Sequence, residues 1–146
     1  GKMEMAMSTT NLTTDIEERD GIQLIRVAGP LDSMTHDQIK NLLDPMVSKP
    51  KALIVLDCEN LKYVNSRGIT LLARYHRAVS ANMGFFGVAG VSSRILKGLE
   101  LLGMGKMLHF YATVGDALKA ATALEGTSGG GAGGAADFGA VQSMAS

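Results

Sequence analysis

The chain has 146 residues, of which 46% are hydrophobic and 19% are charged, and its 14 Lys and Arg residues balance 14 Asp and Glu residues. A chain of this length forms one domain with a substantial core, and zero net charge disfavours nucleic acid or an anionic membrane as a partner. A single cysteine excludes an internal disulfide and a cysteine-based structural zinc site.

Three segments of the chain differ in composition. Residues 1–7 contain three methionines and no periodic pattern, which is typical of a leader or a non-native remnant. Residues 8–125 carry the ordered pattern of one domain, and residues 126–146 form a glycine-rich stretch that is expected to be a flexible tail. No apolar run approaches the roughly 20 residues of a membrane span, and the start lacks a signal-peptide pattern. We therefore expect a cytoplasmic protein without direct membrane insertion.

The N-terminal half of the domain predicts a β-hairpin followed by a helix. Residues 12–19 and 22–28 have strand-like sequences, and Asp20-Gly21 between them supplies the positive φ that a tight hairpin turn requires. Pro45 is expected to kink or shorten the following helix near its end. The residues that predict this helix are the apolar Ile39, Leu42, Leu43 and Met46, with candidate N-caps at Asp32, Ser33 and Thr35.

The rest of the domain predicts alternating strands and helices. Gly103 is expected to end a helix as a left-handed C-cap, and residues 58–65 are expected to form a loop. The order indicates an α/β fold with a mixed, mostly parallel sheet covered by helices. The expected strands are residues 52–57, 84–89 and 108–111, and the expected helices are residues 66–83, Ser92 or Ser93 to 102, and 114–124.

The segment Asn65-Ser66-Arg67-Gly68 is the most informative candidate site. It lies between a buried strand and a helix, and functional residues in such sheets gather at the carboxyl ends of strands. In one interpretation it is only a helix start, with Asn65 or Ser66 as the cap and Gly68 allowing close packing. In the other, the free N–H groups and the helix dipole suit a phosphate, and a phosphoryl group on Ser66 adds about −1.5 to −2 charges. The two interpretations are compatible.

The remaining polar residues predict no catalytic, cofactor-binding or metal-binding site. His36, His76 and His109 lack metal-ligand spacing, and a structural, hydrogen-bonded role is expected for His76. Cys58 follows a buried strand and is expected to act as a small hydrophobic residue. Ser66 lies outside a Gly-x-Ser-x-Gly pattern and has no His and acid at hydrolase spacing. We therefore expect a protein that is not an enzyme and needs no cofactor.

Four segments of the chain resemble the STAS domain, the fold of anti-sigma factor antagonists and of the cytoplasmic domains of sulphate transporters. The resemblance covers nearly all of residues 12–124 and implies the STAS fold. In bacterial antagonists the turn reads Asp-Ser-Ser-Gly or Asp-Ser-Thr-Gly, and the serine after the Asp is phosphorylated. Ser66 occupies that position, while Asn65 and Arg67 differ from the family pattern. The matching segments are Gly29-Pro30-Leu31-Asp32, Leu53–Asp57, Tyr63–Gly68 and Leu101-Leu102-Gly103-Met104.

The resemblance implies an anti-sigma factor antagonist that switches partners without catalysis. Unphosphorylated, it would bind a serine-kinase-type anti-sigma factor. That kinase would phosphorylate Ser66, and a PP2C-type phosphatase would reverse the modification. Arg67 would either steady the phosphate or hinder the kinase. The alternative is a STAS scaffold or accessory subunit of a stressosome-like assembly or of a lipid or anion transporter; the oligomeric state stays open. The implied partner-binding residues are Asp32, Asn65, Ser66, Arg67 and Gly68.

Overall fold

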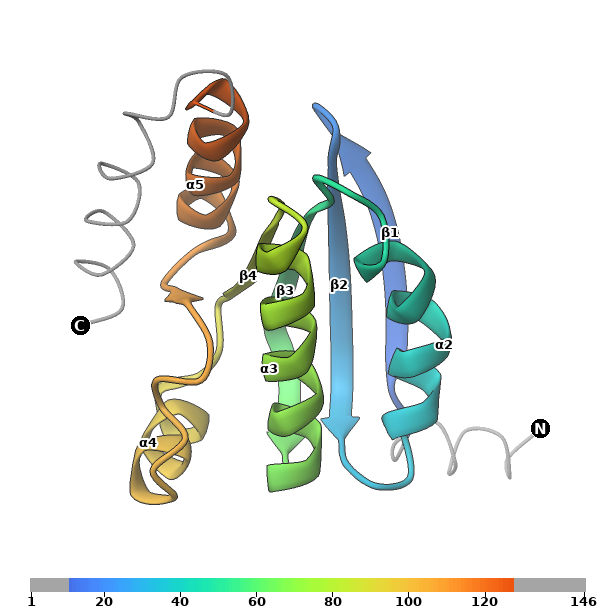
Figure 1. Ribbon diagram of the computed structural model, residues 1–146. Helices are drawn as coiled ribbons and strands as arrows, with labels where there is room; N and C mark the ends of the chain where they lie inside the picture. The colour runs from blue at the N-terminus through green and yellow to red at the C-terminus, as the bar shows by residue number, and fades with distance from the viewer. Residues whose placement is uncertain (1–10, 128–146) are drawn as a thin grey trace.

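The computed structural model describes residues 11–127, which form one sheet with helices packed against it (Figure 1). The strands lie side by side in chain order; the hairpin of the first two is antiparallel and the later pairs are parallel. This confirms the predicted mixed, mostly parallel α/β fold. The strands are β1 (Thr13–Arg19), β2 (Ile22–Leu31), β3 (Leu53–Val64), β4 (Phe85–Ala89) and β5 (Phe110–Tyr111), and the helices are α2 (His36–Val47), α3 (Ser66–Ala81), α4 (Ser93–Leu101) and α5 (Val114–Thr127).

Two apolar clusters, one on each face of the sheet, hold the layers together. Along β2 and β3 side chains alternate between the faces: Ile25 and Ile54 are buried toward α2 and α3, while Val55 is buried toward α5. Ala117 and Ala121 of α5 are fully buried, and these small residues let the helix approach the sheet closely. The strand β3 is therefore covered on both faces along Leu53–Leu56, which explains the continuous apolar sequence of that segment.

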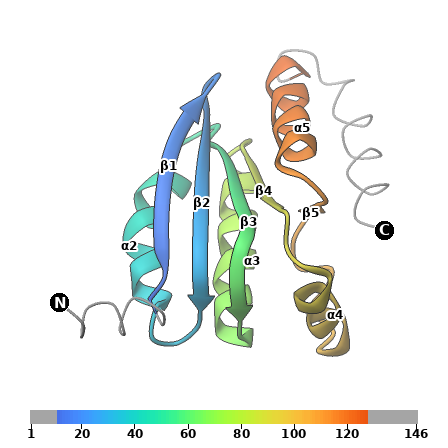
Figure 2. The same cartoon turned by 180° about the vertical axis from the view of Figure 1, so that it is seen from behind.

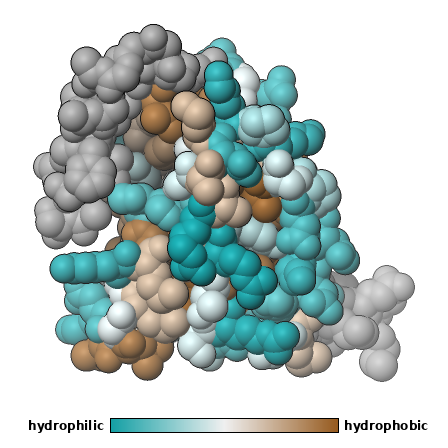
Figure 3. Space-filling model, in the orientation of Figure 1, coloured by the Kyte–Doolittle hydropathy of each residue, from teal (hydrophilic) through white to brown (hydrophobic). Residues whose placement is uncertain are grey.

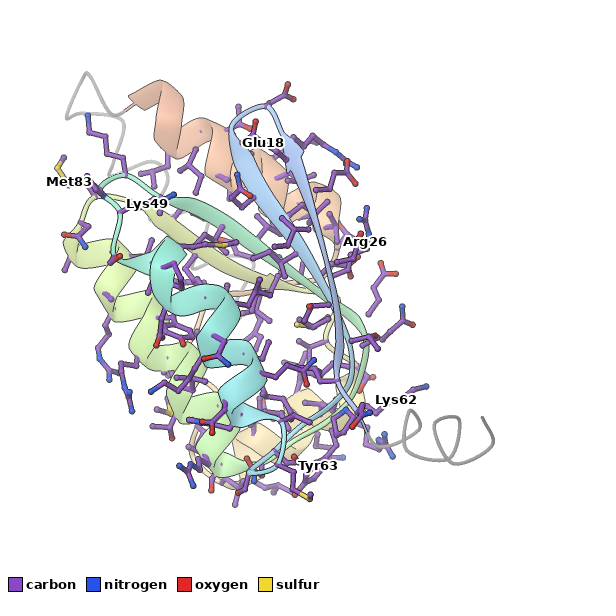
Figure 4. The ribbon with its side chains drawn as sticks, turned by 90° about the vertical axis from the view of Figure 1, so that its right-hand side faces the viewer. Glu18, Arg26, Lys49, Lys62, Tyr63 and Met83 are labelled. Carbon is purple, nitrogen blue, oxygen red and sulfur yellow. The ribbon has the colours of Figure 1, made fainter. Side chains whose placement is uncertain are left out.

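The helices leave part of the second face open. In Figure 2, β1 and β2 lie in front of α2 and α3 with no described helix over them. Arg26 occupies this face (Figure 4) and bonds to Asp15 at 3.1 Å and to Glu17 at 2.9 Å. Hydrogen bonds from Arg19 and Arg26 hold the pKa of the Glu17 carboxyl below its usual range. The helix cover predicted for the sheet is thus incomplete over the hairpin, where charged side chains take its place.

The loop predicted for residues 58–65 is wrong, because β3 continues to Val64. The pairing of β2 with β3 shifts register at two places, and at each shift β3 contains more residues than the facing segment of β2. As a result Ala28 pairs with Asn60 and Leu31 with Val64. The strand β2 likewise runs three residues past the predicted end at Ala28, through Pro30 to Leu31. Pro30 is tolerated because β1 pairs with β2 only as far as Ala28, so the missing N–H faces no partner strand.

The helix ends agree with the predictions at some points and differ at others. Pro45 lies inside α2, which ends two residues later at Val47, so the helix stops close to the proline as predicted. Thr35 occupies the N-cap position of α2 but makes no side-chain capping bond. The helix α5 ends at Thr127 and so includes the first two residues of the predicted tail. The rest of that segment and residues 1–7 lie outside the described part of the chain. Gly103 has φ 72° and ends α4 in the predicted left-handed conformation.

Tyr75→Phe is expected to lower the free energy of unfolding by about 1–2 kcal/mol. Tyr75 is buried on α3, and its hydroxyl donates to Asp44 Oδ1 of α2 at 2.5 Å, so the substitution removes a bond to a carboxylate. Urea denaturation measures the change. Tyr63→Phe is the matched control because Tyr63 is 53% exposed, and it should change the stability by less than about 0.5 kcal/mol. Equal values for the two variants would contradict the prediction.

The His76–His109 pair predicts a loss of stability in acid. The two rings lie 4.8 Å apart, and burial lowers the pKa of both, with the charges of His109 and Arg77 acting further on His76. The unfolded chain therefore binds more protons than the native protein as the pH falls through about 6.5, and stability falls with it. The melting temperature should drop less between about pH 7.5 and about pH 5.5 for His76→Gln/His109→Gln than for the parent. An equal drop would contradict this account.

Candidate partner-binding site at the start of helix α3

The candidate site lies at the end of the sheet where β2 and β3 finish and α3 begins (Figure 1). Asn65 joins these segments: its backbone N–H donates to the Leu31 carbonyl at 3.2 Å, and its Nδ2 donates to Ser33 Oγ at 3.4 Å. The loop after β2 is therefore held against the first residues of α3. Two segments that are far apart in the sequence therefore meet here.

Asn65, and not Ser66, caps α3. Its Oδ1 accepts a hydrogen bond from the Gly68 N–H at 2.8 Å. Ser66 is the first residue of the helix, its side chain is exposed, and its hydroxyl makes no hydrogen bond to the described residues. Ser66 is thus accessible at a helix N-terminus, as the sequence predicts, and its hydroxyl is not needed for the capping of α3.

Gly68 permits the close approach of α3 to β2. A Cβ atom at this position would lie 2.9 Å from both the Leu31 carbonyl oxygen and Leu31 Cγ, and 3.0 Å from Val64 Cγ2. The backbone oxygen cannot rotate away, so any side chain at residue 68 would push the helix start off the sheet. The predicted packing role of Gly68 is confirmed.

Asp32 shapes the loop that faces α3. Its Oδ1 accepts hydrogen bonds from the N–H groups of Met34, at 2.9 Å, and Thr35, at 3.2 Å. The Thr35 hydroxyl in turn donates to the Pro30 carbonyl at 2.8 Å. The carboxylate is therefore engaged with its own loop and fixes the shape of that loop.

Three cationic side chains lie around the start of α3 and the facing end of α4. Arg67 is exposed in the first turn of α3, which contains no acidic residue, and the N-terminus of the helix adds its own partial positive charge. Lys62 at the end of β3 and Arg94 in the first turn of α4 lie across from each other, and Arg94 Nη2 donates to the Lys62 carbonyl at 3.4 Å. A phosphate on Ser66 would be formed in this positive field.

A groove of ≈ 540 Å³ runs beside Ser66, between α4 and the junction of β3 with α3. Its lining is mostly apolar, and the cations Lys62 and Arg94 flank it. The described residues that line the groove are Lys62, Tyr63, Val64, Asn65, Ser66, Arg94, Ile95, Gly98, Leu99 and Leu102.

Exposed apolar side chains gather around the same end. Met34 of the loop is 93% exposed and Tyr63 53%. Leu101, the last residue of α4, is 82% exposed, and Leu102, its C-cap, is 65% exposed. Figure 4 shows Tyr63 and Lys62 at this end, away from Lys49 and Met83 at the opposite end. Figure 3 shows apolar surface over α4 at the lower left. Apolar side chains gathered on one surface of a protein mark an interaction site.

The sequence predicts the start of α3 as a site but not the α4 side of the groove. Arg94, Gly98 and Leu102 were not predicted as site residues; the available signal was Gly98, which interrupts an otherwise good helical pattern.

Elsewhere, Cys58 is buried as predicted, and burial raises the pKa of its thiol. Among the described residues, no group of three or more His, Cys, Asp or Glu side chains could hold a metal ion. In residues 11–127 no helix has the length and apolar character to cross a bilayer.

The family model of the STAS domain matches residues 13–117. The chain belongs to the STAS domain family. It is 25% identical over 109 residues, 74% of this chain and 93% of the relative, to the anti-sigma F factor antagonist of Paenibacillus polymyxa. It is 28% identical over 99 residues, 68% of this chain and 92% of the relative, to the anti-sigma-B factor antagonist of Staphylococcus aureus.

Solved structures agree with this assignment. An anti-sigma factor antagonist from Mycobacterium paratuberculosis superposes with a TM-score of 0.65 and 27% identity, covering 76% of this chain and 94% of that one. The unphosphorylated antagonist SpoIIAA shares the fold, with a TM-score of 0.58 at 23% identity over 73% of this chain and 93% of that one. The murine anion transporter Slc26a9 shares it too, with a TM-score of 0.64 at 13% identity; the match covers 84% of this chain and 24% of the transporter.

Proposed function

We propose that this protein is an anti-sigma factor antagonist that acts as a partner switch without catalysis. In the unphosphorylated form it binds a serine-kinase-type anti-sigma factor, and the sigma factor is released. The observation that carries the proposal is the exposed Ser66 at the N-terminus of α3, beside an apolar groove and at the position that is phosphorylated in antagonists. The relatives named as anti-sigma factor antagonists support it.

The switch needs only a change of charge. Phosphorylation of Ser66 by the bound kinase adds about −1.5 to −2 charges at the centre of the partner-binding set Asp32, Asn65, Ser66, Arg67 and Gly68. The helix start tolerates this charge because the dipole and Arg67 favour it. The complex with the partner does not tolerate this charge, because a dianion at an interface repels like charges and resists desolvation. A PP2C-type phosphatase restores the binding form.

A second function, a STAS scaffold or accessory subunit, is favoured by one observation. Asn65 and Arg67 stand where antagonists carry an acidic residue and a hydroxyl residue. In that function the same surface binds a partner and Ser66 is never phosphorylated. The two functions differ in phosphate transfer, which one assay measures.

The assay incubates the protein with ATP and two purified probes, the anti-sigma-B factor of Staphylococcus aureus and the anti-sigma F factor of Paenibacillus polymyxa. We expect the intact mass to increase by one phosphate, with the modification mapped to Ser66, and no increase for Ser66→Ala. Binding of a probe without phosphate transfer would support the scaffold. Phosphate on another residue would contradict the proposed role of Ser66.

A further inference from the structure

Gly98 is a glycine for which the fold gives no structural reason. It lies in the interior of α4, where glycine is less favourable than alanine. A Cβ atom added there would meet no heavy atom within 4 Å apart from its chain neighbours and the backbone of its own helix. By contrast, a Cβ at Gly68 or Gly84 would collide with main-chain oxygens. Neither backbone conformation nor packing against the rest of the chain therefore requires glycine at this position.

The missing side chain leaves the groove open. Gly98 lines it together with Ile95 and Leu99 of the same helix and the C-cap residue Leu102. Across the groove lie Tyr63 and Val64 at the end of β3. A large side chain at residue 98 would occupy this space. The substitution that best stabilises α4 would therefore narrow the groove, and glycine preserves room for an apolar group from another molecule.

The charges around the groove select the chemistry of that group. Lys62 and Arg94 flank the apolar lining, and none of the described lining residues is acidic. The first turns of both α3 and α4 also lack acidic residues. An apolar side chain carried on an acidic segment fits this groove, whereas a basic segment would be repelled.

We infer that the groove beside Ser66 binds an apolar side chain from an acidic segment of the protein partner, and that Gly98 is the residue that keeps it open. This inference rests on the proposed function and assigns one contact of the antagonist to α4. It also gives the switch a physical mechanism. Ser66 lines the groove, so a phosphate there would repel the acidic segment of the partner. The phosphate would also compete with that segment for Lys62 and Arg94.

The test uses two synthetic peptides as probes, acetyl-Glu-Glu-Leu-Leu-Glu-Glu-amide and the same peptide with lysine in place of glutamate. Each is titrated into the full chain, and backbone amide signals are followed by NMR. We expect the acidic peptide to shift the signals of Lys62, Gly98 and Leu102, and the basic peptide to leave them unchanged. Gly98→Leu should weaken binding about tenfold or more, while Gly98→Ala should stay within about twofold of the parent.

Folding is controlled for, because both substitutions improve helix propensity and neither variant should melt below the parent. Equal shifts with both peptides, no shifts at millimolar concentration, or unchanged binding by Gly98→Leu would overturn the inference. Deletion of residues 128–146 is a further control. If it tightened peptide binding about tenfold, the chain's own segment would be the occupant, which also overturns the inference.

The peptide titration needs no anti-sigma factor, so it tests binding in the groove even if the proposed function is wrong. Conversely, phosphate transfer to Ser66 tests the proposed function even if the groove binds no peptide. With the anti-sigma factor that modifies Ser66, the affinity of Gly98→Leu should fall about tenfold or more while Gly98→Ala keeps it.

Discussion

Gly68→Ala is expected to lower the free energy of unfolding by about 1–3 kcal/mol, although alanine is the better helix former. The new methyl group would lie 2.9 Å from the Leu31 carbonyl oxygen, and relief requires α3 to move away from the end of β2. That movement would also weaken the hydrogen bond from the Asn65 N–H to Leu31, at 3.2 Å. Binding of an anti-sigma factor should therefore fall together with stability.

Gly98→Ala is the matched control, since it places the same methyl group in another helix of the same sheet. Nothing lies within 4 Å of the new atom, so the free energy of unfolding should rise by about 0.5–1 kcal/mol. Urea denaturation of both variants measures the two changes. The free energy of unfolding should fall for Gly68→Ala and rise for Gly98→Ala. A loss of stability in both variants would contradict the claim that residue 98 is free of steric contact.

Ser66→Asp is expected to weaken binding of a kinase-type anti-sigma factor about tenfold or more while leaving the fold intact. An aspartate at the first position of α3 faces the positive end of the helix dipole, which stabilises it by about 0.3–1 kcal/mol. In the complex the same charge lies in the interface, where it meets the repulsion and desolvation that phosphate would cause.

Ser66→Ala separates charge from shape. Because Asn65 is the cap of α3, removing the Ser66 hydroxyl should change stability by less than about 0.5 kcal/mol, and partner binding should persist. Titration calorimetry ranks the two variants by affinity for the partner, and melting curves rank them independently by stability. If Ser66→Asp bound as tightly as the parent, charge at this position would not control the interaction.

The order of strands and helices was predictable because the apolar residues of each buried element recur at a spacing typical of one type of secondary structure. The apolar run from Leu53 to Leu56 indicates a strand covered on both faces, and α2 and α3 show apolar residues at helical spacing. The turn at Asp20-Gly21 was equally clear, and both residues have positive φ. These signals are local, and the sheet confirms them.

The second half of β3 was not predictable, because its period is not that of a regular strand. The register shifts place Cys58, Leu61 and Val64 toward the core at intervals of three residues, with exposed polar residues between them. This spacing lacks the two-residue alternation of a regular strand, and the segment 58–65 was predicted as a loop. The strand depends on pairing with β2, which no local pattern reveals.

Only the part of the candidate site that is contiguous in the sequence was predictable. Asn65 to Gly68 are adjacent in the sequence, and their helix-start chemistry is visible there. Lys62 and Arg94 are 32 positions apart and meet only because α4 packs beside the end of β3. The groove between them is a product of tertiary structure, and Gly98 was its one sequence signal.

The most direct test of the account is a calorimetric titration of one anti-sigma factor with two forms of this protein. One form is unmodified, and the other carries a single phosphate on Ser66, verified by mass spectrometry. We predict that the unmodified form binds and that the phosphorylated form binds about a hundredfold more weakly, with unchanged melting behaviour of the free protein. Equal affinities for the two forms would contradict the switch and leave Ser66 as the first residue of a helix within a binding scaffold.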